Sequence, residues 1–162
     1  MTGFASIPWG TPLAEITARR GEPSERQESG GGVSSVVFSD TISGRAASAI
    51  FDVHREHGLV AGSYIVRIED PTTCELLYRQ FDQAVRERYP TLSPEENPPQ
   101  GVEPGYCDDI RAGRGGRMTT WRDPANGSTA QVILAPPAQG IVLLYRSRRS
   151  HELSAEQRQQ KY

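Results

Sequence analysis

The predicted elements come in the same order twice along the chain, and this repetition limits how the chain can fold more than any other feature. Residues 4–70 contain a short helix and then three strand-like runs, and residues 72–147 contain the same series. The runs are Val33 to Ser39, Ala46 to Val53 and Gly62 to Ile68 in the first unit, and Met118 to Arg122, Thr129 to Leu134 and Ile141 to Tyr145 in the second. One such unit cannot enclose a core, whereas two units can share one sheet or pack face to face.

We therefore predict an α+β fold built as a tandem α-β-β-β repeat, with an antiparallel sheet and its helices packed on one face. A chain of 162 residues has the size of one domain and needs no metal in order to fold. Residues 1–149 are expected to form this domain from the repeats 4–70 and 72–147. Residues 150–162 are polar and are expected to form a C-terminal tail that either frays or is ordered by a partner.

The second helix is the best-defined element of the sequence. Its apolar residues recur at helical spacing, at Cys74, Leu77, Tyr78, Phe81 and Val85. Thr72 and Glu75 are expected to form a capping box at its start. In the first helix, Thr11 is the expected N-cap, Pro12 takes the first helical position and Gly21 is the C-cap.

Three segments have the composition of turns or loops. Gly30-Gly31-Gly32, after residues 25–29, is predicted to be a flexible connector. Residues 90–116 contain four internal prolines and are predicted to lack regular structure. Asn126-Gly127 is a hairpin signal. A loop as long as residues 90–116 is usually functional or disordered.

Overall charge points to no class of partner. The formal net charge is −2, so binding of nucleic acid or of anionic lipid would need a local patch, and we predict no nucleic-acid partner. The chain has no run of about 18 apolar residues, and no transmembrane segment is expected. No signal-like segment opens the chain.

The two cysteines, Cys74 and Cys107, are placed so that they could form a disulfide. Such a bridge would close a loop of roughly 30 residues and would stabilise the fold by about 3 to 4 kcal/mol in the chain-entropy model. Two free thiols are the alternative, because the sequence does not fix the redox compartment.

Three clusters contain residue types that can bind a metal or an anion or act in acid-base catalysis, but none lies in the structural context that such a site requires. The first cluster is Asp52, near the end of a predicted strand, with His54, Glu56 and His57 in the hairpin turn after it. Arg55 in that turn would repel a cation, so we expect a solvated turn. Adjacent carboxylates at Asp108 and Asp109 are expected to be surface charge. Residues 113–117 are Gly-rich and basic but precede no helix. We predict no catalytic, metal or cofactor residue and no enzymatic activity.

The remaining polar and aromatic residues suit recognition of another molecule. Tyr and Arg are enriched where interfaces derive most of their binding energy. The candidate interaction residues lie in the long loop, at the start of the strand that follows it, and after the last strand: Tyr106, Arg111, Arg114, Arg117, Arg146, Arg148 and Arg149.

The first 25 residues of the chain contain a sequence motif that resembles one known from other proteins. It reads Phe4-x-x-Ile7-x-Trp9-Gly10-Thr11-Pro12-x-x-Glu15-Ile16, followed by Arg20-Gly21-Glu22-Pro23. This resembles the start of small bacterial exported and lipoprotein domains, and is similar to the tandem-repeat domains of β-lactamase-inhibitor-protein type and of outer-membrane-assembly lipoproteins. The resemblance implies an antiparallel sheet with helices on one face that binds other proteins without an active site. The second half of the chain lacks this motif. No lipidation cysteine lies near Met1.

The sequence thus predicts a non-enzymatic protein-binding or structural module, for which we expect a peripheral role in a bacterial envelope assembly. A small-molecule-binding domain with its site between the two repeats is the alternative. A periplasmic or otherwise exported location is expected, with a cytoplasmic one as the alternative.

Overall fold

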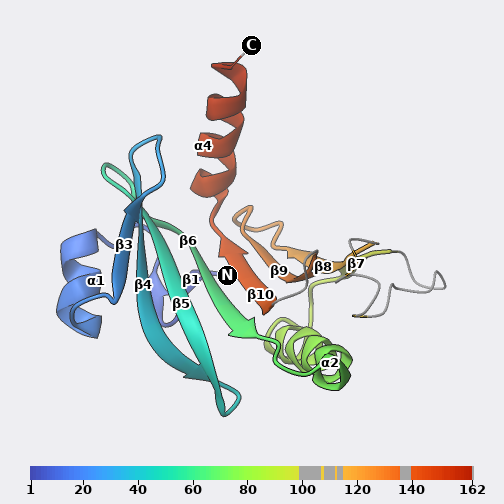
Figure 1. Cartoon of the computed structure of the whole chain (residues 1–162). Coiled ribbons are helices and arrows are strands. Elements are labelled where there is room, and N and C mark those ends of the chain that lie inside the picture. Colours follow the sequence, from blue (N-terminus) through green and yellow to red (C-terminus); the bar gives the residue numbers. More distant parts are fainter. Residues whose placement is uncertain (99–106, 108–111, 113–114, 136–139, 162) are drawn as a thin grey trace.

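The structure is a computed structural model, and it describes residues 1–98, 107, 112, 115–135 and 140–161. Eight strands form one antiparallel sheet: β3 (Glu25–Glu28), β4 (Val33–Ile42), β5 (Arg45–His54), β6 (Gly58–Arg67), β7 (Pro94–Asn97), β8 (Arg117–Arg122), β9 (Thr129–Leu134) and β10 (Gly140–Arg146). A small hairpin of β1 (Gly3–Phe4) and β2 (Ile7–Pro8) precedes them. The described helices are α1 (Leu13–Arg20), α2 (Pro71–Arg88) and α4 (Arg148–Gln159). The predicted α+β class with an antiparallel sheet is confirmed (Figure 1).

The strand order of the sheet is β3-β4-β5-β6-β10-β9-β8-β7. The four strands that follow α1 therefore fill one half of the sheet, and the four that follow α2 fill the other. The halves meet where β6 pairs with β10. Each half has four sheet strands rather than the three predicted, and whether the halves are copies of one repeat stays a prediction.

The two strands that sequence patterning missed are both at the edges of the sheet. Every residue of β3 is exposed, and β7 lies in the stretch that was predicted to be irregular. An edge strand has one neighbour and can carry charge on both faces, so it lacks the apolar alternation that marks a strand. The Gly30-Gly31-Gly32 connector is a tight turn between β3 and β4, with φ values of 78°, 61° and 77° that only glycine adopts readily.

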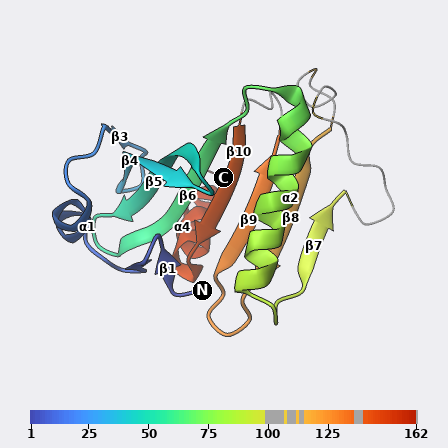
Figure 2. The same ribbon diagram turned by 90° about the horizontal axis from the view of Figure 1, so that it is seen from below.

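The core lies on one face of the sheet. Directly paired positions place Phe51 of β5, Tyr145 of β10 and Trp121 of β8 in one buried row across the sheet. Gly62 is also in this row, and a β-carbon there would overlap the Phe4 ring of β1. α1 and α2 pack on this face, and Figure 2 shows α2 lying across β8 and β9.

Both predicted N-caps are wrong. Asp70 caps α2 by accepting a hydrogen bond from the Thr72 backbone N–H at 3.0 Å, because Pro71 takes the first helical position. Glu75 instead forms ion pairs with Arg79 and Arg117. The N-cap of α1 is Pro12 rather than Thr11, whereas Gly21 is the C-cap as predicted.

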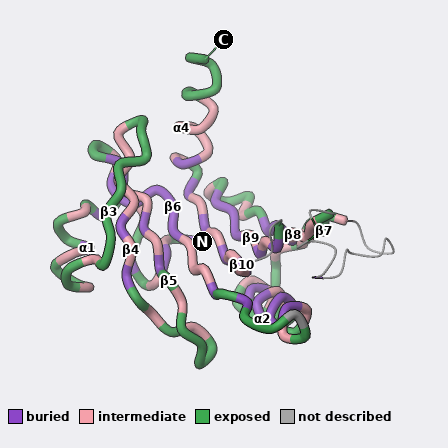
Figure 3. The backbone as a smooth tube through the Cα atoms, viewed as in Figure 1, coloured by how far each residue is buried: buried purple, intermediate pink, exposed green. Residues whose placement is uncertain are grey.

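The prediction of an irregular C-terminal tail is wrong, because α4 occupies Arg148–Gln159. The Ser147 hydroxyl caps the helix by accepting from the Ser150 N–H at 3.2 Å, and Glu152 pairs with both Arg148 and Arg149. These side-chain pairs allow a helix without an apolar stripe. Its C-terminal half is exposed and projects from the sheet (Figure 3).

Cys74 of α2 and Cys107 form a disulfide with Cα atoms 6.2 Å apart, and both residues are buried. The bridge that the sequence allowed is therefore present, and it ties the segment after β7 to α2. None of the described helices combines the length and the apolar character that crossing a membrane requires.

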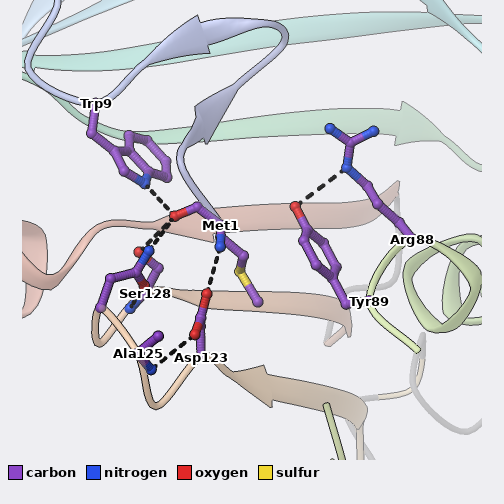
Figure 4. A network of polar contacts seen from close by, with 8 residues as sticks. Met1, Trp9, Arg88, Tyr89, Asp123, Ala125 and Ser128 are labelled. Atoms are coloured by element: carbon purple, nitrogen blue, oxygen red, sulfur yellow. Dashed lines mark hydrogen bonds and ion pairs between the residues drawn. The ribbon is translucent and has the colours of Figure 1, made fainter. Parts of the chain in front are cut away.

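The first residues are anchored to the β8–β9 turn, as Figure 4 shows. The Met1 carbonyl oxygen accepts hydrogen bonds from Trp9 Nε1, Asn126 Nδ2 and Ser128 Oγ. The Met1 backbone nitrogen lies 2.6 Å from Asp123 Oδ2. These contacts hold the β1–β2 hairpin against the second half of the sheet.

Candidate functional site

The face of the sheet opposite α1 and α2, which we call the open face, carries a continuous apolar row. The row crosses four neighbouring strands through directly paired residues, in the order Ile65 of β6, Val142 of β10, Ile133 of β9 and Met118 of β8. Strands lie about 4.8 Å apart, so the row spans about 14 Å. Ser48 and Asn97 pair with its two ends and bound it with polar side chains.

Three more apolar residues extend this row, two of them beside it and the third paired with one of those two, and together the seven form what we call the apolar patch. The added residues are Val37, Ile50 and Leu144. All seven are half-buried, yet none belongs to the core or packs against it. In the part of the chain that the structure describes, α1 and α2 pack on the other face, and α4 contacts only the end of this one. A contiguous apolar surface of this kind is typical of a contact site.

A cavity of about 330 Å³ lies at the end of the open face, beneath α4. Its charged and hydroxyl lining comes from Ser35, Asp52, Arg146, Ser150 and Ser154. Its apolar walls are Val33, Val60, Leu144 and Leu153. Because Leu144 belongs to both surfaces, the cavity and the apolar patch are continuous.

Asp52 supplies the negative charge of the cavity. The Ser35 hydroxyl donates a hydrogen bond of 2.6 Å to Asp52 Oδ1. Burial raises the pKa of Asp52 above its ordinary value of 3.8, and this effect outweighs the opposing influence of Ser35 and Arg146. The folded protein therefore holds a carboxylate in a place that disfavours its charge.

Arg146 supplies the positive charge, and neutral groups hold it in place. Its Nε donates to Ser150 Oγ at 3.0 Å, and its Nη2 donates to the Ser150 carbonyl and to Ser154 Oγ. Burial lowers the pKa of Arg146, an effect that Arg158 adds to and Asp52 opposes. Neither Asp52 nor Arg146 forms an ion pair with any residue that the structure describes.

Two contacts that involve histidines hold α4 against the strands of the sheet and the turns between them. The Arg149 guanidinium donates to His57 Nε2 at 2.8 Å, and the His54 and His57 rings stack with centroids 4.7 Å apart. His54 is only 7% exposed, so the prediction of a solvated turn is wrong for this residue. On the other side, His151 contacts the Thr129 hydroxyl at 2.9 Å. No group of three or more His, Cys, Asp or Glu that could hold a metal occurs among the described residues.

The structure gives the predicted interaction arginines intramolecular contacts. Arg117 pairs with Glu75 and lies 4.3 Å from the centroid of the Tyr78 ring, and Arg148 pairs with Glu152. Arg149 and Arg146 hold α4, as described above, and of these residues only Arg146 lines the cavity. The remaining candidates, Tyr106, Arg111 and Arg114, lie outside the described residues.

A larger cavity, of about 550 Å³, lies where β5 and β6 separate beyond the Ser48–Ile65 pair. Its charged lining residues, among them Arg45, Arg67 and Glu69, are exposed. Water therefore screens their charges, in contrast to those beneath α4, and we place the candidate site at the α4 cavity and the apolar patch.

We expect Asp52→Asn to raise the free energy of unfolding at pH 7 by about 0.5 to 2 kcal/mol, the range of single stabilising substitutions. The pKa of Asp52 is raised on folding, so the folded state binds the proton more tightly than the unfolded state. The carboxylate then destabilises the protein progressively as pH rises from 3.8 through the folded-state pKa. Urea denaturation between pH 4 and pH 7 should show the advantage of the variant growing with pH.

Glu95→Gln is the matched control, because Glu95 lies on the same face but outside the cavity. A variant Asp52→Asn that loses stability at pH 7 would contradict a raised pKa of Asp52 in the folded protein.

Comparison of the chain with models of protein families, with curated proteins and with solved structures finds no match. The resemblance to inhibitor-type and lipoprotein domains therefore stays a prediction, and the argument for function depends on the geometry of the open face.

Proposed function

We propose that this protein is a non-enzymatic binding module that holds another protein on the open face of its sheet. The observation that carries the proposal is the apolar patch, whose seven residues lie outside the core on a sheet face that α1 and α2 leave uncovered. An eight-stranded sheet with one packed face supplies a rigid platform for such contacts.

The dimensions of the apolar row favour a helical partner segment. The row is about 14 Å long from Ile65 to Met118, and a helix with its side chains is about 10 to 12 Å across. A partner that presents one apolar helical stripe would cover Val142 and Ile133 at the centre of the row and leave Ser48 and Asn97 at the rim. A polar rim around an apolar centre is the usual anatomy of a protein interface.

The disulfide supports the exported location within the same proposal. Disulfides persist in oxidising compartments such as the bacterial periplasm and are rare in the cytosol. Cys74 and Cys107 are both buried in this bridge, which favours a protein that folds after export. A role as a peripheral subunit of an envelope assembly is consistent with a binding platform in that compartment.

A photo-crosslinking residue at Ile133 tests the proposal in the native host. We expect it to capture one protein whose yield falls at least about tenfold when Val142→Lys places a charge in the centre of the row. The matched control is Leu76→Lys, because Leu76 is 52% exposed on α2, away from the open face. The control variant should capture the same protein at the wild-type yield.

Capture that does not change with Val142→Lys would overturn the proposal, because the crosslink would then report chance proximity. Crosslinks formed only between copies of this chain would overturn it as well, since they would show self-association. Circular dichroism of each variant checks that the fold is kept.

A further inference from the structure

The α4 cavity contains two opposite charges that form no ion pair with one another. Asp52 and Arg146 lie in one row on either side of Ala61, which pairs with both. Two strand spacings put their Cα atoms about 10 Å apart. The short Ala61 side chain between them leaves a notch with a carboxylate on one wall and a guanidinium on the other.

Both charges are held in position by neutral groups, and neither forms an ion pair with a described residue. One oxygen of Asp52 is bound by the Ser35 hydroxyl, and the Nε and Nη2 atoms of Arg146 are bound by neutral oxygens of Ser150 and Ser154. Among the described residues, Asp52 Oδ2 and Arg146 Nη1 make no hydrogen bond. Half-buried charges that form no ion pair are costly, and groups whose pKa is shifted by burial are concentrated at functional sites.

The charges of the cavity restrict the class of ligand. A phosphate or another simple anion would be repelled by Asp52, and a simple cation would be repelled by Arg146. A molecule that carries both charges would be attracted at both ends. The volume of about 330 Å³ suits one small molecule, and Val60, Leu144 and Leu153 give it an apolar wall.

We infer that the α4 cavity binds a small zwitterion of the α-amino-acid class, with its ammonium group at Asp52, its carboxylate at Arg146 and an aliphatic side chain against Leu144 and Leu153. This site goes beyond the proposed protein-binding function and does not depend on it, because the ligand contacts residues beneath α4 rather than the apolar row.

Calorimetric titration of the full chain with L-leucine, glycine, isocaproate and isopentylamine tests the inference. Isocaproate lacks only the ammonium group of L-leucine, and isopentylamine lacks only its carboxylate. We expect L-leucine to bind at millimolar concentration or below, and each one-charge analogue to bind at least about tenfold more weakly, as the loss of one charged hydrogen bond predicts. Glycine should also bind more weakly, because it cannot contact the apolar wall.

Three variants locate the site. Asp52→Asn is expected to weaken L-leucine binding at least about tenfold while folding normally, and Ala61→Leu should block it by filling the notch. Arg146→Gln should also weaken binding. The matched controls are Glu95→Gln and Arg122→Gln, because both residues are on the open face but outside the cavity. The controls should bind L-leucine as the wild type does.

Equal binding of L-leucine and isocaproate would overturn the zwitterion assignment, and so would the absence of L-leucine binding at millimolar concentration. Binding that survives both Asp52→Asn and Ala61→Leu would place the ligand elsewhere and overturn the site. Because Val142→Lys leaves the cavity charges unchanged, failure of partner capture and failure of ligand binding can be told apart.

Discussion

Loss of the Cys74–Cys107 disulfide is expected to lower the free energy of unfolding by about 3 to 4 kcal/mol. The bridge joins residues 33 positions apart, and cutting it releases the conformational entropy of that loop in the unfolded chain. The folded state also loses a covalent link between α2 and the segment after β7. This is a large share of the stability of a domain of this size.

Urea denaturation of the oxidised protein and of the double variant Cys74→Ala/Cys107→Ala measures the effect. The denaturant dependence of the unfolding free energy should rise in the variant, because an uncrosslinked unfolded chain exposes more surface. The control is the oxidised protein after reduction, which should match the double variant to within about 1 kcal/mol, since both lack the link. A variant as stable as the oxidised protein would contradict the prediction.

Sequence patterning located the elements whose residues face a core. β9 has the predicted bounds, β8 begins one residue earlier than predicted, and β10 extends one residue further at each end. α2, Pro71–Arg88, contains all five apolar residues whose spacing predicted it. Such elements carry a periodic apolar signal because one side must pack.

Elements that pack no side against a core lack this periodic apolar signal, and the sequence analysis therefore missed them. β3 and β7 are edge strands, and α4 depends on side-chain caps and ion pairs rather than on an apolar stripe. For α4 a signal was present, since Ser147 can cap a helix and Glu152 follows Arg148 at helical spacing.

The candidate site could be predicted only in part. Arg146 was among the predicted interaction residues, whereas Asp52 was dismissed with the neighbouring histidines. Their approach depends on the register that pairs β5 with β6 and β6 with β10, and on α4, which covers them. Sequence periodicity gives the face of a residue but not its cross-strand neighbour, so the two charges could not be brought together without the structure.

Replacement of Tyr78 by alanine is expected to destabilise the protein about as much as loss of the disulfide does. We expect it to lower the free energy of unfolding by about 3 to 5 kcal/mol. Tyr78 is fully buried where α2 meets β8 and β9. Its hydroxyl lies 2.7 Å from Thr119 Oγ1, and the Arg117 guanidinium covers its ring. Truncation would leave a cavity at the main contact between α2 and the second half of the sheet.

Two milder variants separate packing from hydrogen bonding. Tyr78→Phe keeps the ring and is expected to cost only about 0.5 to 1.5 kcal/mol. Thr119→Val leaves the buried Tyr78 hydroxyl only its longer bond, of 3.5 Å, to the Val132 carbonyl oxygen and should cost about 1 to 3 kcal/mol. The double variant Tyr78→Phe/Thr119→Val removes both partners, so it should be more stable than the sum of the two losses predicts. Strict additivity would show that the two hydroxyls do not interact.

The loss of stability at alkaline pH is an independent test of the burial of the Tyr78 hydroxyl. Burial raises the pKa of Tyr78 from 10.0 to about 12, against smaller opposing effects of Thr119 and Arg117. The folded state therefore binds the phenolic proton more tightly, and its stability should fall as pH rises from 10 toward 12. This alkaline loss should be smaller in Tyr78→Phe than in the wild type. Equal losses in the two proteins would mean that Tyr78 ionises as readily in the folded chain as in the unfolded one.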